Sequence, residues 1–276
     1  MTLKAGRHIL IAALLVISAQ AAFAETRSLD PDALSPALEG RTSDFLAVDL
    51  GDGTRCELAG SDLTRRHAPW STFKIPNFVN ALETGVALGP DHWRDWDQDR
   101  RPAAAYWPRA WRQGQTLAAA FQRSAAWYFQ DVALDVGEGR YRQILEAWAY
   151  GNANAPDGDD GFWLGGPLTV SVEEQVAFVG ALLSGEIDVA PATLDALFSV
   201  SADGALGAHV VHGKTGSGPV EPGRFDGAFE GWYVGWLARQ GAAPVALAHY
   251  VRAQTFSDLR TFRRDHALVL LEACGF

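Results

Sequence analysis

The sequence predicts an α+β fold: an antiparallel sheet formed by N- and C-terminal segments, flanked by helices, with an inserted all-helical subdomain. Two observations predict this class. Short apolar runs bounded by glycine occur at about 44–58 and again at about 208–252, whereas helical periodicity dominates between them. Strands at both ends with helices in the middle favour one sheet to which both ends contribute. The 276 residues, 48% of them hydrophobic, suffice for such a core.

Residues 1–24 have the features of a secretory signal peptide. Lys4 and Arg7 precede an apolar run at 9–17, and Ala22-Phe23-Ala24 forms a small-residue cleavage site. The run is too short for a membrane span, and no later stretch is long or apolar enough to be one. We therefore expect cleavage, export and a periplasmic mature protein.

The mature chain, residues 25–276, is expected to form a single domain. Its sheet part would comprise about 25–85 and 200–276, and its helical part about 86–199. Without the leader the chain has 21 basic and 33 acidic residues, a net charge of −12. No basic cluster is large enough for nucleic acid or an anionic membrane surface. We expect a monomer or homodimer that binds a small molecule.

The N-terminal part is predicted to contain a β-hairpin and the first helix. Residues 44–50 and 54–58 are short apolar segments on either side of Gly51-Asp52-Gly53, which is a hairpin signal. Pro69 precedes a helical pattern over about 71–83. This helix is expected at the junction of the sheet and the helical part, where clefts tend to form.

The rest of the chain alternates loops, helices and strands. Residues 86–112 contain three prolines, and 152–166 are rich in Gly, Asn and Asp, so both are predicted to be loops. Ser171 and Glu174 form a capping box at the start of a helix. The predicted helices cover about 116–136, 140–150, 171–183, 191–198 and 257–273. The predicted strands cover about 208–213, 231–239 and 244–252.

Cys56 and Cys274 are the only cysteines. In an oxidising compartment they could bridge the two ends of the mature chain, or both could remain unpaired in the core. The sequence leaves both possibilities open. His209 and His212 would point to opposite faces of a strand, and no other metal-ligand spacing occurs, so no metal is predicted.

The apolar turn around Ser71 carries the strongest chemical signal. Ser71 and Lys74 are three positions apart, so a helical turn places an amine within reach of a hydroxyl. The flanking Trp70 and Phe73 would desolvate the amine and lower its pKa, as a general base requires. The chain has three lysines against twenty arginines. Lys74 and Lys214 are the two outside the leader, which suggests that these positions need an amine.

Two further segments could contribute to the same cleft. Lys214-Thr215-Gly216 follows the strand predicted at 208–213, where a fixed cation could hold a carboxylate or assist proton transfer. Ser124 lies within the predicted helix over 116–136 and could relay a proton, although a helix serine alone is more often structural. A third segment, Tyr150-Gly151-Asn152, closes a predicted helix with a glycine cap, and this structural role alone would explain it.

Taken together, these segments resemble one family. In this order and at these separations, they are similar to the motif series of class D (oxacillinase-type) serine β-lactamases. The matching segments are Ser71-Thr-Phe-Lys-Ile-Pro76, Ser124-Ala-Ala126, Tyr150-Gly-Asn152, Phe162-Trp-Leu164, His212-Gly-Lys-Thr-Gly216 and Gly231-Trp-Tyr-Val-Gly-Trp236. Ser-x-x-Lys with Lys-Thr-Gly marks the wider penicillin-recognising superfamily, including DD-peptidases. The Tyr-Gly-Asn and Phe-Trp-Leu segments indicate class D. The resemblance covers about residue 44 to the C-terminus.

The resemblance implies hydrolysis of β-lactam antibiotics through a covalent intermediate. Ser71 would be the nucleophile, and Lys74, carbamylated to N6-carboxylysine, would be the general base. Trp163 would donate its indole N–H to the carbamate. Ser124, beside Lys214, would relay a proton to the leaving nitrogen. No cofactor other than CO2 or bicarbonate, which carbamylates Lys74, is implied.

The resemblance also implies a substrate-binding set: Thr215, Gly216, Ser217, Ala126 and Leu164. The backbone N–H groups of Ser71 and Ser217 would form an oxyanion hole. An arginine of the closing helix would bind the substrate carboxylate. We prefer Arg264, with Arg260 and Arg263 as competitors, because the register of the helix cannot be set from one sequence.

One departure and two alternatives accompany this interpretation. Ala126 stands where the family usually has valine, so we expect a looser lid over Lys74, easier water entry and less stable carbamylation. The first alternative is a β-lactam sensor that is acylated without turnover. Such sensors are normally attached to a transmembrane region, and no transmembrane region is predicted in this sequence. The second is a DD-peptidase, against which the Tyr-Gly-Asn and Phe-Trp-Leu segments argue. The loops at about 100–112 and 217–230 leave the substrate range open.

Overall fold

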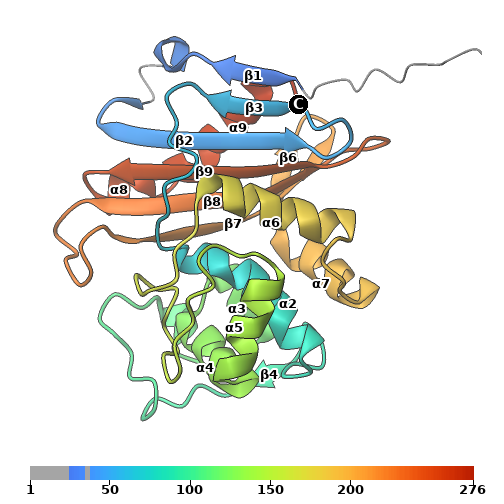
Figure 1. Ribbon diagram of the computed structural model, residues 1–276. Helices are drawn as coiled ribbons and strands as arrows, with labels where there is room; N and C mark the ends of the chain where they lie inside the picture. Colours follow the sequence, from blue (N-terminus) through green and yellow to red (C-terminus); the bar gives the residue numbers. More distant parts are fainter. Residues whose placement is uncertain (1–24, 35–37) are drawn as a thin grey trace, which may run out of the picture.

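The structure is a computed structural model that describes residues 25–34 and 38–276, so the predicted leader lies outside the described residues. Its main element is a seven-stranded sheet in the order β1-β3-β2-β9-β8-β7-β6 (Figure 1). The strands are β1 (Thr26–Leu29), β2 (Arg41–Asp49), β3 (Arg55–Leu58), β6 (Ala202–Leu206), β7 (His209–Pro219), β8 (Phe229–Ala238) and β9 (Val245–Ala253). All neighbours are antiparallel except β1 and β3, which run parallel. The predicted α+β class is confirmed, with this edge pair as the exception to an antiparallel sheet.

Both ends of the described chain contribute to this sheet. β2 pairs with β9 along its whole length, so that Leu46 lies opposite Ala248. Phe45 and Ala47 belong to the core under α9 (Phe262–Ala273), whereas Leu46 belongs to the larger core that includes the other helices. Because successive side chains of a strand point to opposite faces, each central strand serves both cores.

The helices cover both faces of the sheet and extend below it (Figure 1). α6 (Val172–Ser184) packs on β2, β8 and β9 from one face, and α9 packs on the same strands from the other. The remaining elements are η1 (Pro31–Leu34), η2 (Trp70–Phe73), α2 (Lys74–Glu83), β4 (Trp93–Arg94), η3 (Arg109–Trp111), β5 (Gln115–Thr116), α3 (Leu117–Arg123), α4 (Ala126–Val136), α5 (Glu138–Ala147), α7 (Pro191–Ser201) and α8 (Phe256–Leu259). α6 lies on the sheet although the sequence placed its residues in the helical part.

The segment around Ser71 joins the sheet to the helices. The short turn η2 contacts β7 and β8, while α2, which follows it directly, contacts α3, α4 and α7. The capping box predicted at Ser171 is present, since its hydroxyl accepts from the Glu174 N–H and the Glu174 carboxylate accepts from the Ser171 N–H. Within the described residues, no helix is long and apolar enough to cross a bilayer.

Several predicted elements differ from the structure. The helix predicted over 116–136 is interrupted at Ser124, which has a φ of 60° and ends α3. The closing helix is likewise divided into α8 and α9. β7 extends to Pro219, so Lys214-Thr215-Gly216 lies inside the strand, because pairing with β8 continues as far as Phe229. β6 was not predicted, since its Asp203-Gly204 is not strand-like and its pairing with β7 decides its conformation.

Cys56 of β3 and Cys274 at the end of α9 form a disulfide, with their Cα atoms 6.0 Å apart. Both cysteines are buried in the core under α9. The possibility of two unpaired cysteines is therefore wrong. The bond joins residues 218 positions apart, and cross-links of this kind typically stabilise a protein by about 2–4 kcal/mol by constraining the unfolded chain.

Candidate active site

Ser71 lies in the 3-10 turn η2, which continues into α2 at Lys74. The Nζ of Lys74 donates a hydrogen bond to the Ser71 Oγ at 2.9 Å. Lys74 has no exposed surface, whereas Ser71 is half-buried and accessible. The hydroxyl therefore has a buried amine as its immediate neighbour, which is the arrangement that activates a serine.

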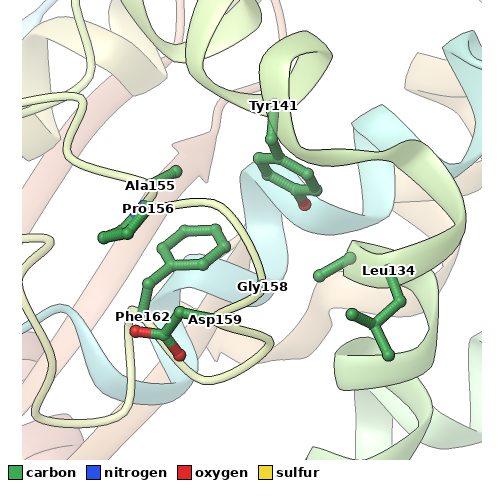
Figure 2. Close-up of a pocket in the computed structure, with 8 residues that line it drawn as sticks. Leu134, Tyr141, Ala155, Pro156, Gly158, Asp159 and Phe162 are labelled. Atoms are coloured by element: carbon green, nitrogen blue, oxygen red, sulfur yellow. The ribbon is translucent and has the colours of Figure 1, made fainter.

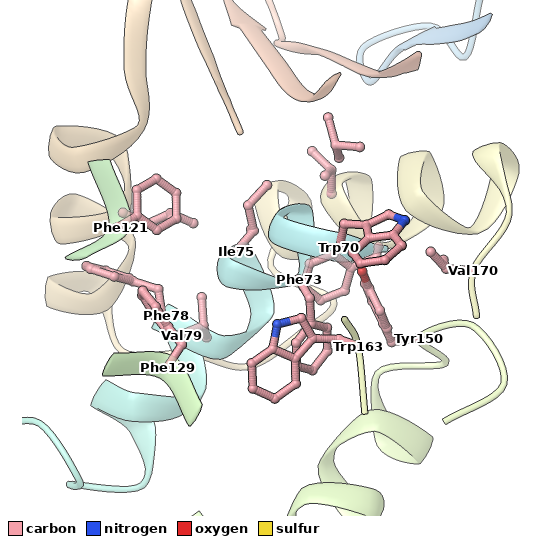
Figure 3. Packing of buried hydrophobic residues seen from close by; sticks show 14 of the residues in the cluster. Trp70, Phe73, Ile75, Phe78, Val79, Phe121, Phe129, Tyr150, Trp163 and Val170 are labelled. Atoms are coloured by element: carbon pink, nitrogen blue, oxygen red, sulfur yellow. The ribbon is translucent and has the colours of Figure 1, made fainter. Parts of the chain in front are cut away.

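The surroundings of Lys74 favour its neutral form. Burial lowers the pKa of the Lys74 ammonium well below its ordinary value, and the positive charge of Lys214 lowers it further. The centroid of the Phe129 ring lies 5.5 Å from the Lys74 Nζ. Figure 3 shows the apolar packing around α2, with Phe129 on one side and Trp163 beside Phe73. A neutral amine can accept a proton or attack CO2.

Lys214 reaches the site from β7. Its Nζ donates to the Ser124 Oγ at 3.0 Å and to the Thr215 carbonyl at 2.9 Å. Burial lowers the pKa of Lys214 to about 7, the positive Arg263 acts in the same direction, and Asp203 opposes them. The structure thus forms two lysine–serine pairs, Lys74 with Ser71 and Lys214 with Ser124.

Replacing Lys214 with methionine is expected to stabilise the protein at acidic and neutral pH. The folded-state pKa is about 7 and the ordinary value 10.5, so between these values the unfolded chain binds the additional proton. The cost of the buried ammonium is therefore greatest below pH 7 and disappears towards pH 10.5. We expect a gain in unfolding free energy of about 2–4 kcal/mol at pH 6. Urea unfolding of both proteins at pH 6, 8 and 10 measures it, and a difference independent of pH contradicts it.

Gly216 allows β7 to approach the turn that carries Ser71. A Cβ at this position would lie 2.8 Å from the Pro69 carbonyl oxygen, 2.9 Å from the Thr72 nitrogen and 3.0 Å from the Ser71 nitrogen. These are backbone atoms, so no side chain fits without displacing the turn. Thr215 and Ser217, on either side of Gly216, are half-buried.

Trp163, which packs against Phe73, has an indole N–H donor without a partner in the described part of the chain. Its side chain is fully buried, and its indole N–H has no hydrogen-bond partner among the described residues. Leaving a buried donor without an acceptor costs about 1–3 kcal/mol, so this position suits a ligand or modification that accepts a hydrogen bond. The Trp163 ring lies 5.2 Å from the ring of Phe73, which precedes Lys74. Leu164, the next residue, is half-buried.

The loop that carries Trp163 is anchored to α4 by an arginine that the sequence did not single out. Arg101 donates two hydrogen bonds to the Asp131 carboxylate, at 2.9 and 3.0 Å, and pairs with Asp160 at 2.6 Å. Gln130 also donates to Asp160 at 3.2 Å. Arg101 lies in a segment that was predicted only as a loop. The only sequence signal for it was the position of a basic residue close to several acidic ones.

The choice of Arg264 for the substrate carboxylate is not supported by the geometry. Arg264 is bound to Asp203, with a distance of 2.8 Å from its Nε to the Oδ2. Arg263 is instead buried, and its Nη1 donates to the Gly216 carbonyl at 3.0 Å. Burial and the positive charge of Arg260 lower the pKa of Arg263 to about 10. Arg260 itself is exposed.

Two aromatic residues at the site were also not identified from the sequence. The rings of Phe121 and Phe129 lie 5.9 Å and 5.5 Å from the Nζ atoms of Lys214 and Lys74, respectively. Their sequence signal was the apolar periodicity on either side of Ser124, which is the same as that of an ordinary core. Ala126, at the start of α4 between them, is half-buried.

Other features lie outside this site. Figure 2 shows a pocket between α4, α5 and the loop that follows α5; its lining contains no lysine or serine and consists of Ala133, Leu134, Tyr141, Ala155, Pro156, Gly158, Asp159 and Phe162. Within the part of the chain that the structure describes, no group of three or more His, Cys, Asp or Glu residues could hold a metal ion. His212 is stacked on Trp236 and hydrogen-bonded to the Ser201 hydroxyl.

Comparison with known proteins shows to which class of protein the chain belongs. Residues 51–260 match the family of the penicillin binding protein transpeptidase domain. The chain is 35% identical over 185 residues to β-lactamase OXA-10 of Pseudomonas aeruginosa, an alignment that covers 66% of this chain and 67% of that protein. The solved structure of the class D β-lactamase YbXI from Nostoc has a TM-score of 0.78 and 27% identity, over 88% of this chain and 98% of the other. The chain belongs to the class D serine β-lactamase family.

A receptor shares the same fold. The C-terminal domain of the Bacillus licheniformis BlaR penicillin-receptor has a TM-score of 0.79 and 23% identity, over 91% of this chain and 97% of that one. At this identity the likeness concerns the fold alone. The relatives as a group support hydrolysis or binding of β-lactams.

Proposed function

We propose that this protein hydrolyses β-lactam antibiotics through an acyl-enzyme on Ser71, with a carbamylated Lys74 as general base. The observation that carries the proposal is the hydrogen bond between the Ser71 hydroxyl and a completely buried lysine whose pKa is lowered. Burial and an apolar surrounding favour the neutral amine that both base catalysis and carbamylation require.

Each side chain has a defined task in acylation. The Ser71 Oγ forms a bond to the β-lactam carbonyl carbon while its proton passes to the base at Lys74, and the ring C–N bond breaks. Ser124 delivers a proton to the leaving nitrogen and is reprotonated by Lys214, whose pKa of about 7 allows this near neutral pH. The backbone N–H groups of Ser71 and Ser217 would stabilise the developing oxyanion.

Carbamylation of Lys74 fits the residues present. A carbamate on Lys74 would supply a carboxylate that accepts protons from Ser71 and from the deacylating water. Trp163 has a buried indole N–H without a partner among the described residues, and a carboxylate is the acceptor that would satisfy it. The Phe129 ring, 5.5 Å from the Lys74 Nζ, would help to exclude water from the carbamate.

The substrate-binding residues follow from their place on β7 and α9. Arg263 would attract the substrate carboxylate, in place of Arg264, because its guanidinium contacts Gly216, whereas that of Arg264 is bound to Asp203. Thr215 and Ser217 of β7, together with Ala126 and Leu164, would contact the substrate. The disulfide between Cys56 and Cys274 supports the proposal of export to the periplasm, since such bonds persist in oxidising compartments.

Steady-state turnover of a chromogenic β-lactam, with and without bicarbonate, tests the proposal. We expect many turnovers per molecule and an increase in rate with bicarbonate. The competing function is a sensor, favoured by the likeness of the fold to the BlaR penicillin-receptor domain. A sensor would give one equivalent of product and then stop as a stable acyl adduct on Ser71, which mass spectrometry detects.

Replacing Ala126 with valine is expected to reduce the bicarbonate concentration needed for half-maximal activity by about threefold or more. The added methyl groups would cover the carbamate and slow its loss, at a stabilisation of about 0.8 kcal/mol per buried methylene-sized group. The measurement is activity across a bicarbonate series. Ala133→Val, in the same helix but at the pocket of Figure 2, is the matched control and should leave that concentration unchanged. Equal bicarbonate dependence in Ala126→Val and the original protein contradicts the expectation.

A further inference from the structure

Trp70, the residue before the nucleophile, has a backbone conformation that a large side chain rarely adopts. Its φ is 52°, in the left-handed region. A non-glycine residue there costs roughly 1–2 kcal/mol relative to an ordinary conformation. The conformation persists only if the surroundings hold it, and it determines how the chain enters the turn that carries Ser71.

Three contacts hold Trp70. Its indole N–H donates to the Glu230 Oε1 at 2.8 Å, and its backbone N–H donates to the Trp163 carbonyl at 3.1 Å. Its ring lies between Gly165 and Gly218, where a Cβ would come within 2.7 Å and 2.2 Å of ring atoms. The ring therefore fits between two backbone segments that have no side chains at these points.

Glu230 is a buried acceptor on β8 that the proposed chemistry does not use. It is 8% exposed, and its second oxygen, Oε2, accepts from the Tyr250 hydroxyl at 2.9 Å and lies 3.5 Å from His67 Nδ1. The His67 ring stacks on Tyr250 with a centroid separation of 3.8 Å. A buried carboxylate is costly unless it is hydrogen-bonded, so its partners are strongly constrained in position.

The contacts of Trp70 connect two parts of the site. Trp70 is covalently joined to Ser71, and its backbone hydrogen bond ends on Trp163. Figure 3 shows Trp70, Phe73 and Trp163 within one packed cluster. A displacement of Trp70 would therefore move both the nucleophile and the unpaired indole donor. Misplacement of a reacting group by about 1 Å can reduce a rate by about 10²-fold.

We propose that Trp70, held by the buried carboxylate of Glu230, is a positioning residue that orients Ser71 for attack on the β-lactam carbonyl. This inference rests on the proposed function. The hydrogen bond between the Trp70 indole and Glu230 retains the left-handed conformation, and that conformation directs the Ser71 hydroxyl and backbone N–H towards the substrate. Trp70 and Glu230 act through Ser71.

The experiment compares acylation rates of single variants at saturating bicarbonate, by mass spectrometry of the acyl adduct on the millisecond-to-second scale. Trp70→Phe retains a ring and removes the donor, so the second-order rate constant for acylation should fall about tenfold or more. Glu230→Ala should give a similar loss. Glu230→Gln retains an oxygen that accepts from the indole and should recover acylation to within about threefold of the original protein.

Tyr233→Phe is the matched control. The Tyr233 hydroxyl donates to the Asp203 Oδ2 at 3.0 Å, so this variant also removes one donor to a carboxylate, but from the opposite face of β8. Its melting temperature is compared directly with that of Trp70→Phe, and its acylation rate should equal that of the original protein. A role of Trp70 in stability alone would lower melting temperature without this difference in rate.

Three outcomes overturn the inference. Trp70→Phe and Glu230→Ala could both acylate at the original rate, or Tyr233→Phe could lose as much acylation as Trp70→Phe at an equal loss of stability. In either case the original protein still acylates and the proposed function stands. If the original protein forms no adduct, the proposed function fails and the positioning role fails with it.

Discussion

Replacing Lys74 with arginine is expected to reduce acylation by a β-lactam about 10³-fold, within the range of general base catalysis. Arginine retains a positive charge and length but does not release its proton near neutral pH, whereas the buried Lys74 has a pKa well below its ordinary value. Arginine also cannot be carbamylated as an amine is. Stopped-flow measurement with a chromogenic cephalosporin, at low and high bicarbonate, gives both the rate and its bicarbonate dependence.

Two further variants make this prediction specific. Lys74→Met is neutral and similar in length, so it should fold at least as well as the original protein while showing the same loss of acylation. Ser71→Ala removes the hydroxyl that contacts Lys74 and defines the background rate. An arginine variant that acylates within tenfold of the original protein would show that a neutral amine at this position is not required.

Replacing Gly216 with alanine is expected to lower acylation about 10²-fold, comparable to the loss of one oxyanion-hole donor. The added Cβ would lie 2.8–3.0 Å from three backbone atoms of the turn that carries Ser71, so either the turn or β7 must move. The separation of the Ser71 and Ser217 N–H groups would change with it. The rate of acylation under pseudo-first-order conditions measures the effect, and circular dichroism checks that the variant is folded.

Gly89→Ala is the control for this substitution. A Cβ at Gly89 would have no atom within 4 Å, and its φ is outside the left-handed region, so alanine fits there without displacement. We expect original rates from Gly89→Ala. Equal acylation by Gly216→Ala and Gly89→Ala would mean that the close approach of β7 to the turn is not needed for catalysis.

Much of the fold could be predicted because its signals are local. The hairpin around Gly51, the capping box of Ser171 and the main strands each depend on a few adjacent residues, and the structure has all of them. The elements that were wrong depend on partners distant in sequence. Ser124 lies between two stretches with the same helical periodicity, and its left-handed conformation has no local signal.

The candidate site shows the same division. Ser71 and Lys74 are three residues apart, so the reach of the amine to the hydroxyl follows from one helical turn. The choice between Arg263 and Arg264 depends on the rotation of α9, because adjacent residues of a helix point about 100° apart and only one of them meets Gly216. That rotation is set by the apolar residues that α9 buries against the sheet.

The sequence alone determined the residue types and their order: a serine and an amine in an apolar turn, a second amine in a glycine-bounded segment, and strands at both ends of the chain. Only the tertiary structure decided which groups meet. It joined Cys56 to Cys274, placed Arg263 rather than Arg264 against Gly216, and placed Glu230 within hydrogen-bond distance of the Trp70 indole. Local geometry acts over a few residues, whereas these contacts span tens to hundreds of residues and depend on how the sheet and helices pack.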